Sequence, residues 1–231
     1  MGKFSGFETL ESMSQAVWYN KWTVKKFAPF LNGDILEVGC GIGNFTNALT
    51  KFGNVWAIDV KKNYIKQTKK IILDSTEVGF GDIENGKYFF DKRAFDCIVC
   101  LNVLEHINYD TKALVNMYKL LATSGVLIIL VPSHNFLFGE IDKSIGHIRR
   151  YEKDSLLKIL ESIGFKIKFV RILNFLGAIG WYVWGKILKD KKIDLVSINL
   201  FNLVAPFILS MENLIEPPVG TSILIIAEKI K

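Results

Sequence analysis

Runs of apolar residues alternate with segments of helical periodicity along most of the chain. Seven runs have the length and the β-branched or aromatic content of strands, at residues 34–38, 54–58, 76–80, 95–100, 125–131, 165–172 and 222–228. Most of the segments between them repeat apolar residues every three or four positions, as in "TKALVNMYKLL". Strands that alternate with helices predict a parallel sheet covered by helices on both faces.

Two segments fall outside this alternation. Residues 9–30 form a helical stretch ahead of the first strand, and residues 173–219 hold two apolar runs joined by "KDKKID". Neither run predicts a transmembrane helix, because the first is short and carries Asn174 and the second carries several polar residues and Pro206. We expect a single domain over residues 1–231 with a helical cap insertion before the last strand.

Composition and charge exclude few functions. Half of the residues are apolar, mean hydropathy is +0.26 and the formal net charge is +6. A positive excess permits contact with phosphate, lipid headgroups or nucleic acid without choosing among them. The first residues lack the pattern of a signal peptide, so a cytoplasmic location is the expectation.

The three cysteines indicate neither a disulfide framework nor a metal site. Their number is odd, which argues against paired disulfides. Cys97 and Cys100 are three positions apart on a predicted strand, so their side chains point to opposite faces and cannot easily share a metal ion. We predict buried core positions for both and no metal site in the chain.

A glycine-rich turn follows the first predicted strand in "ILEVGCGIG" (residues 35–43). Gly39, Gly41 and Gly43 let the backbone approach a ligand closely, and the next helix offers free N–H groups at its start. Asp59 ends the second strand, where a carboxylate can accept hydrogen bonds from both hydroxyls of a ribose. The pattern therefore predicts a ligand that contains ribose.

The glycine spacing favours one kind of ribose cofactor. A dinucleotide fingerprint reads G-x-G-x-x-G, whereas this turn reads G-x-G-x-G and is preceded by Glu37. An acid at this position disfavours a pyrophosphate and suits the cationic S-adenosylmethionine. Two alternatives stay open here: a nicotinamide-dependent oxidoreductase, which the missing glycine disfavours, and a non-catalytic S-adenosylmethionine-binding partner subunit.

Four motifs strengthen this interpretation by their order. "LEVGCGIG", "AIDV", "GDIE" and "FDCIVCLNVLEHI" lie within residues 34–131 and together resemble the class I S-adenosylmethionine-dependent methyltransferases. The resemblance implies an α/β fold with a Rossmann-like, doubly wound, seven-stranded sheet whose last strand is antiparallel. It also implies an enzyme with S-adenosyl-L-methionine as its cofactor.

The resemblance assigns cofactor contacts by position. The acid and glycines of the turn would line the methionine end, Asp59 would hold the ribose, Asp82 would meet the adenine, and Asn102 would help close the site. The implied cofactor-binding residues are Glu37, Gly39, Gly41, Gly43, Asp59, Val60, Asp82, Ile83, Asn102 and Val103.

The sequence indicates the residues that would act on the methyl acceptor less specifically than those that would bind the cofactor. His106, His134 and His147 are candidate catalytic residues, because an acceptor that loses a proton needs a base. Each could equally be an ordinary polar loop residue. Arg149 and Tyr151 are candidate substrate contacts, with a surface ion-pair cluster as the alternative.

The long connection over residues 132–156 carries all of these candidates except His106. Its sequence resembles a subgroup with small-molecule and isoprenoid-quinone-type O-methyltransferases and proteins found with cell-surface polysaccharide enzymes. This resemblance implies a small acceptor, lipid-linked or aromatic, and not a nucleic acid. The apolar insertion at residues 173–219, with its basic linker, would cap the acceptor site, rest on a membrane surface, form a homodimer interface or pack on its own core.

Overall fold

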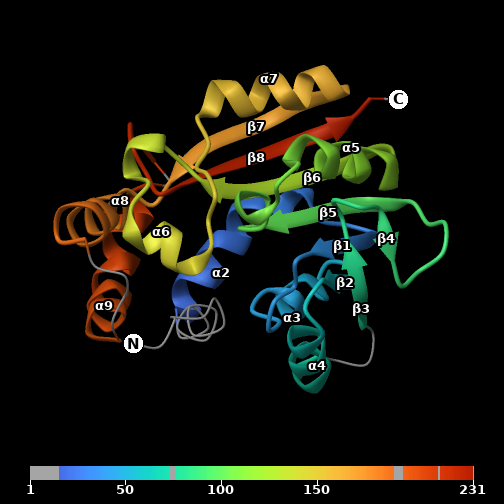
Figure 1. Ribbon diagram of the computed structural model, residues 1–231, viewed down its shortest axis with the longest axis horizontal. Coiled ribbons are helices and arrows are strands. Elements are labelled where there is room, and N and C mark those ends of the chain that lie inside the picture. The colour runs from blue at the N-terminus through green and yellow to red at the C-terminus, as the bar shows by residue number, and fades with distance from the viewer. Residues whose placement is uncertain (1–15, 73–75, 190–194, 213, 231) are drawn as a thin grey trace.

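The computed structural model describes residues 16–72, 76–189, 195–212 and 214–230, and the side chains of residues 195–200 lie outside the description. Its strands form one mixed sheet in the order β4-β3-β2-β1-β5-β6-β8-β7 (Figure 1). The strands are β1 (Asp34–Val38), β2 (Asn54–Asp59), β3 (Thr76–Asp82), β4 (Lys87–Tyr88), β5 (Phe95–Leu101), β6 (Leu121–Pro132), β7 (Phe165–Leu173) and β8 (Ser222–Lys229).

All seven predicted strands are present, and the last strand is antiparallel as expected. β1 pairs in parallel with β2 and β5, whereas β8 runs antiparallel to both β6 and β7. The eighth strand, β4, pairs two residues with Gly81 and Asp82 at the end of β3. A strand of two residues is too short to show an apolar pattern, so it could not be predicted from the sequence.

Helices and single turns connect the strands. They are α2 (Val17–Phe27), η1 (Ala28–Phe30), α3 (Thr46–Leu49), α4 (Lys62–Ile71), η2 (Leu104–His106), α5 (Asp110–Leu120), η3 (Asn135–Leu137), α6 (Glu140–Ile145), α7 (Lys153–Ile163), α8 (Phe175–Gly180), η4 (Trp181–Ile187) and α9 (Leu195–Met211). The connection over residues 132–156 is thus not a plain loop, because η3 and α6 fold within it. Residues 9–15 of the predicted N-terminal helical stretch lie outside the described residues, and α2 begins at Val17.

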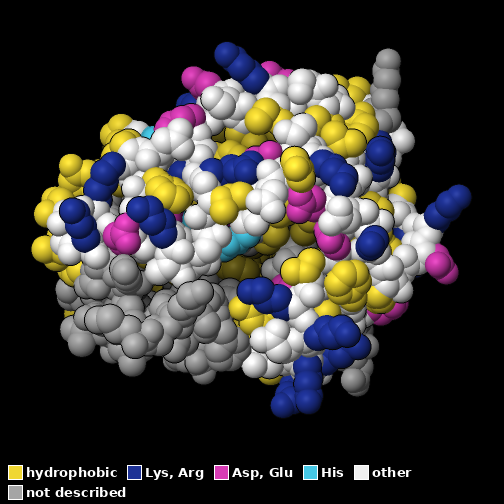
Figure 2. All heavy atoms as spheres, in the orientation of Figure 1, with side chains coloured by type: hydrophobic (Ala, Val, Ile, Leu, Met, Phe, Trp, Pro, Cys, Tyr) yellow, Lys and Arg dark blue, Asp and Glu magenta, His cyan; other side chains and the backbone are white. Residues whose placement is uncertain are grey.

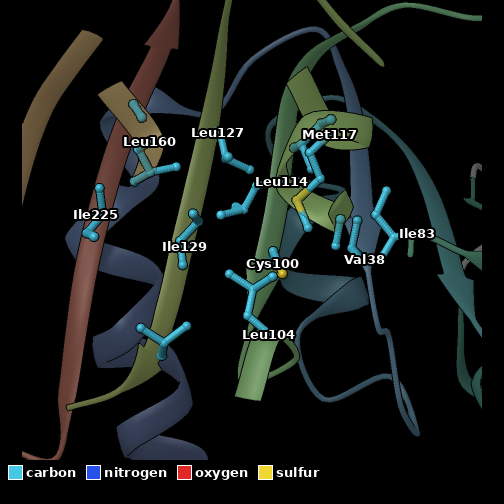
Figure 3. Close-up of a cluster of buried hydrophobic side chains, with 14 of the residues drawn as sticks. Val38, Ile83, Cys100, Leu104, Leu114, Met117, Leu127, Ile129, Leu160 and Ile225 are labelled. Carbon is cyan, nitrogen blue, oxygen red and sulfur yellow. The ribbon is translucent and has the colours of Figure 1, made fainter. Parts of the chain in front are cut away.

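Two apolar layers cover the faces of the sheet, which makes the fold doubly wound. α5 and α7 pack on one face, where Leu114, Met117 and Leu160 meet Cys100 and Ile129 (Figure 3). α2 and α9 pack on the other face, together with Cys97. The two cysteines therefore lie in opposite layers and are buried, as their spacing predicted.

The start of α7 differs from the expectation by two residues. Glu152, not Asp154, precedes the first helical turn, because Tyr151 still pairs with Ser133 in an extended bridge. The helix ends as expected at Gly164, which has a φ of +112° and donates its N–H to carbonyls of the last turn.

The insertion between β7 and β8 is helical and is fastened at its base. Glu212 is buried after α9, and its carboxylate accepts hydrogen bonds from the N–H groups of Asn174 and Phe175, each at 2.8 Å. Asn174 in turn caps α8 by accepting from the Gly177 N–H. Among the described residues, every helix is too short or too polar to cross a membrane.

Candidate functional site

The glycine turn lies at the carboxyl ends of β1 and β2. Gly39, Gly41 and Gly43 have φ values of +74°, +56° and +88°, a region that favours glycine. The Gly39 N–H donates to the Ile58 carbonyl at 2.8 Å. A Cβ on Gly39 would lie 2.3 Å from the Val103 side chain, so the turn also packs tightly against the residues that follow β5.

Asp59 fixes the glycine turn to the end of β2. Its carboxylate accepts from the Gly41 N–H at 3.0 Å and from the Lys61 N–H at 2.8 Å. Desolvation raises the pKa of Asp59, although these hydrogen bonds oppose the shift. Each carboxylate oxygen has a second lone pair, so the residue retains the capacity to accept hydrogen bonds from a ribose. The adjacent Val60 is exposed at this edge.

Glu37 lies beneath the turn and is buried. It accepts a hydrogen bond of 2.6 Å from the Thr46 hydroxyl at the start of α3. Burial raises the pKa of Glu37 to about 7, the Thr46 hydrogen bond opposes this shift, and the charge of Asp59 adds to it. Two buried carboxyl groups close together favour a cationic ligand, which fits S-adenosylmethionine better than a pyrophosphate.

Asp82 and Ile83 form the outer edge of the predicted cofactor site. The Asp82 carboxylate accepts from the N–H and the side-chain amide of Asn85, which hold the turn after β3. Partial desolvation opposes the effect, but the Asn85 hydrogen bonds hold the pKa of Asp82 below its usual range. Ile83 is buried and its carbonyl accepts from Asn116 at 2.8 Å. Their contact with adenine stays a prediction.

The residues that follow β5 and β6 have unusual backbones. Asn102 has a φ of +55° and donates its N–H to the Leu130 carbonyl at 2.7 Å. His134 has a φ of +59°, in a region that residues other than glycine seldom adopt. Non-glycine residues in this region cluster at functional sites, and these two lie after neighbouring strands at the same edge of the sheet.

His106 and His147 come together beside a buried acid. Their ring centroids are 4.9 Å apart, and His147 Nε2 lies 3.5 Å from Glu105 Oε1. His106 Nδ1 lies 3.0 Å from the carbonyl oxygen of Gly146. Figure 2 shows histidine surface in the hollow at the centre of the face that it draws. The fold thus joins two of the three candidate histidines.

Glu105 was not among the candidate residues, although it directly precedes His106. It is fully buried, and neither of its carboxylate oxygens has a hydrogen-bond partner among the described residues. Burial raises the pKa of Glu105 to about 7, and the nearby His147 and Arg150 oppose the shift. Desolvation and His147 lower the pKa of His106 to about 4, although part of His106 remains exposed.

Asp142 of α6 is the centre of a hydrogen-bond network that the sequence did not reveal. Its buried carboxylate accepts from His147 Nδ1, from Nε and Nη2 of Arg150 and from Nε1 of Trp181, over 2.9–3.2 Å. Burial opposes ionisation, but His147 and Arg150 hold the pKa of Asp142 below its usual range. Trp181 belongs to the insertion, so the network joins the insertion to His147.

Arg149 and Tyr151 hold the connection after β6 against α5. Arg149 pairs with Asp110 and donates to the Asn108 carbonyl at 2.9 Å. The Tyr151 side chain is buried, with its hydroxyl 2.9 Å from the Asp110 carboxylate and 3.1 Å from the Leu104 carbonyl. These contacts match the ion-pair alternative, while a role in substrate binding stays a prediction.

His134 lies apart from the paired histidines. Its Nδ1 is 3.7 Å from the Glu152 carboxylate, and the centroids of its ring and the Phe136 ring are 5.4 Å apart. The group of donors that contains Glu105, His106 and His147 does not include it. A catalytic role for His134 therefore has less geometric support than one for the other two histidines.

Comparisons with known proteins point to one family of enzymes. The family described as "Methyltransferase domain" matches residues 19–168. An uncharacterised protein of Methanocaldococcus jannaschii is 32% identical over 160 residues, which cover 68% of this chain and 65% of that protein. The ubiquinone biosynthesis O-methyltransferase of Rickettsia typhi is 25% identical over 161 residues, which cover 61% of this chain and 63% of the relative. The chain thus spans less than two thirds of the length of both relatives.

A solved structure shows the same fold over nearly the whole chain. The N-methyltransferase NodS of Bradyrhizobium japonicum, in complex with S-adenosyl-L-homocysteine, aligns with a TM-score of 0.56. The alignment covers 97% of this chain and 88% of NodS, at 17% identity. Because the family match covers more than half of the chain and includes the glycine turn and its acids, this chain belongs to the class I S-adenosylmethionine-dependent methyltransferases.

Proposed function

We propose that the chain transfers a methyl group from S-adenosylmethionine to a small acceptor that enters beside His106 and His147. One observation carries this proposal. The carboxyl edge of the sheet holds both the glycine turn with Asp59 and the paired histidines that follow β5 and β6. Ligands of open α/β sheets bind at this edge, so cofactor and acceptor would meet there.

The residues of the turn suit the two ends of the cofactor. Asp59 would accept hydrogen bonds from the ribose while it holds Gly41. Glu37 and Asp59 would provide negative charge beside the cationic methionine end. S-adenosylmethionine supplies a methyl group on a sulfonium, and the protein's main task is to align the acceptor with it.

The acceptor atom bonds to the methyl carbon as the bond from that carbon to sulfur breaks. An acceptor hydroxyl or amine also loses its proton, and the cluster of Glu105, His106 and His147 is placed to assist this loss. The O-methyltransferase name of the Rickettsia typhi relative supports an acceptor with a hydroxyl group. The alternative of a nicotinamide oxidoreductase has no support from the family match.

A labelled-methyl screen tests this function. Purified protein with radiolabelled S-adenosylmethionine is offered phenols, a lipid extract, sugar nucleotides, total RNA and a protein extract in separate reactions. We expect label in one small-molecule fraction, and we expect His147→Gln to lower transfer by about 100-fold or more while the cofactor affinity is retained. Label in nucleic acid or protein would contradict the acceptor class, and binding without transfer to any acceptor would favour a non-catalytic subunit.

A lipid surface is the partner that we propose for the insertion. Leu203, Phe207 and Met211 recur every fourth residue on α9 and are 69%, 76% and 68% exposed. Leu214 and Ile215, which follow the helix, are also largely exposed. Such an apolar stripe on a chain with net charge +6 suits peripheral contact with an anionic membrane, where a lipid-linked acceptor would reside.

A further inference from the structure

Three side chains beside the proposed acceptor site have the composition of a metal-binding group. The donor atoms of Glu105, His106 and His147 all lie within 4.8 Å of one another. Glu105 and His106 belong to η2, which follows β5, and His147 follows α6. The fold therefore brings one carboxylate and two imidazoles to one point from separate segments.

Hydrogen bonds hold Nδ1 of both imidazoles. A carbonyl oxygen can only accept, so the Gly146 carbonyl at 3.0 Å places the proton of neutral His106 on Nδ1. The Asp142 carboxylate, which is 2.9 Å from His147 Nδ1, does the same for His147. In the neutral form each ring then has its lone pair on Nε2, and that of His147 is 3.5 Å from Glu105 Oε1. Metal-binding histidines characteristically donate their second ring N–H to a carboxylate or a backbone carbonyl, and both kinds of partner occur here.

The carboxylate of Glu105 has His147 Nε2 at 3.5 Å but lacks a hydrogen bond. It is fully buried, and neither oxygen accepts a hydrogen bond from any described residue. The nearby Arg150 directs its donors elsewhere, to the Asp142 carboxylate and the Ser133 carbonyl. A buried carboxylate without hydrogen bonds is costly unless a cation pairs with it.

We propose that Glu105, His106 and His147 bind one divalent first-row transition-metal ion, with Zn²⁺ as the best match to the donor set. Two imidazoles and one carboxylate suit Zn²⁺, Mn²⁺ or Fe²⁺ and leave coordination positions open, whereas Mg²⁺ and Ca²⁺ prefer oxygen ligands. Tetrahedral bonds of about 2 Å separate ligands by about 3.3 Å. His147 Nε2 and Glu105 Oε1 are already 3.5 Å apart, and binding would draw in the His106 donor atom, which lies within 4.8 Å of both.

The role of the ion in catalysis rests on the proposed function. A hydroxyl oxygen of the acceptor occupies an open position on the ion, which lowers the pKa of that hydroxyl. The proton leaves to solvent, and the bound oxygen then attacks the methyl carbon as the bond to sulfur breaks. The histidines are ligands in this scheme, and the acceptor is a compound with an acidic hydroxyl. Sequence reasoning, which considered only the cysteines, predicted no metal.

Direct metal binding provides the test, because it needs neither cofactor nor acceptor. Tag-free protein is treated with chelator, desalted and titrated with Zn²⁺ by calorimetry and with Co²⁺ by visible absorption. We expect one ion per chain with micromolar or tighter affinity. Glu105→Gln and His147→Gln should each weaken binding by about 100-fold or more, whereas His134→Gln should bind as wild type. His134 is the matched control because it is the remaining histidine.

Thermal unfolding separates a lost ligand from a lost fold. Glu105→Gln replaces a buried charge with a neutral side chain of the same shape, so we expect the metal-free variant to fold and to unfold no lower than wild type. Zn²⁺ should then raise the unfolding temperature of wild type and His134→Gln but not of Glu105→Gln. Absence of binding to wild type, or equal affinity of Glu105→Gln, would overturn the proposal. Metal binding without methyl transfer would leave the site in place and refute only the proposed function.

Discussion

Gly41 is the residue at which backbone geometry most directly limits the cofactor site. Its φ is +56° and its N–H donates to Asp59, in the turn that we expect to contact the methionine end of the cofactor. Gly41→Val adds a branched side chain that this backbone region disfavours. We expect loss of S-adenosylmethionine binding in calorimetry with a circular dichroism spectrum close to that of wild type. Gly164→Ala, which strains the end of α7 instead, is the control and should retain affinity.

Glu37 predicts how cofactor affinity depends on pH. Its pKa of about 7 means that it gains its charge as the pH rises through neutrality. Affinity for the cationic cofactor should therefore increase between pH 6 and pH 8 in wild type, and it should change less in Glu37→Gln. Calorimetry at both pH values measures the difference. Parallel pH profiles for the two proteins would contradict the role of Glu37.

The raised pKa of Glu37 also predicts that the stability of the cofactor-free protein falls as the pH rises, opposite to the trend in cofactor affinity. A carboxyl whose folded pKa is raised from 4.5 to about 7 binds protons more tightly in the folded state. Its contribution to stability is fully present below pH 4.5 and is lost as the pH rises through 7. Urea unfolding without cofactor should thus show Glu37→Gln gaining stability relative to wild type between pH 5 and pH 8. A constant difference would argue that Glu37 is ionised throughout.

At the scale of elements, the strands and most of the helices between them were predictable, and the contacts between distant connections were not. β1 and β5 are continuous apolar runs because both of their faces are buried, and this pattern is visible in the sequence. The positions of Asp59 and Asn102 follow from the ends of such strands. The network of Asp142 depends on α6 and η4, which are distant in sequence. No local pattern therefore predicts the hydrogen bond from Trp181 to Asp142. The proposed metal-binding group likewise joins segments that are distant in sequence, so no local pattern indicates it.

The contact between α6 and the insertion has a measurable energy. The Trp181 indole donates to the Asp142 carboxylate at 2.9 Å, and the Arg150 guanidinium lies 5.2 Å from the ring. Trp181→Phe retains an aromatic ring but removes the donor, which should lower the free energy of unfolding by about 1.5–3 kcal/mol. Urea unfolding of Trp181→Phe beside the more exposed Trp184→Phe tests this estimate. An equal decrease in the free energy of unfolding of both variants would show that the hydrogen bond from Trp181 to Asp142 does not contribute specifically.

At the scale of the molecule, the apolar stripe of α9 predicts membrane affinity. Phe207→Glu should reduce co-sedimentation with vesicles that contain anionic lipid, because it places a negative charge where apolar contact is expected. Phe80→Glu alters an exposed phenylalanine on β3 and should bind vesicles as wild type does. A different outcome is that the wild-type protein does not bind vesicles and sediments as a dimer, which Phe207→Glu dissociates. The stripe would then be a subunit interface.

Calorimetric titration of S-adenosylmethionine into wild type and Asp59→Ala is the most direct test of the central claim, that the glycine turn and Asp59 hold the cofactor. Asp59 offers two carboxylate oxygens to the ribose, and the loss of two charge-assisted hydrogen bonds should cost on the order of 2–4 kcal/mol. The account predicts one cofactor per wild-type chain, no binding of NAD, and affinity more than tenfold weaker in folded Asp59→Ala. An unchanged dissociation constant for the folded variant would contradict it.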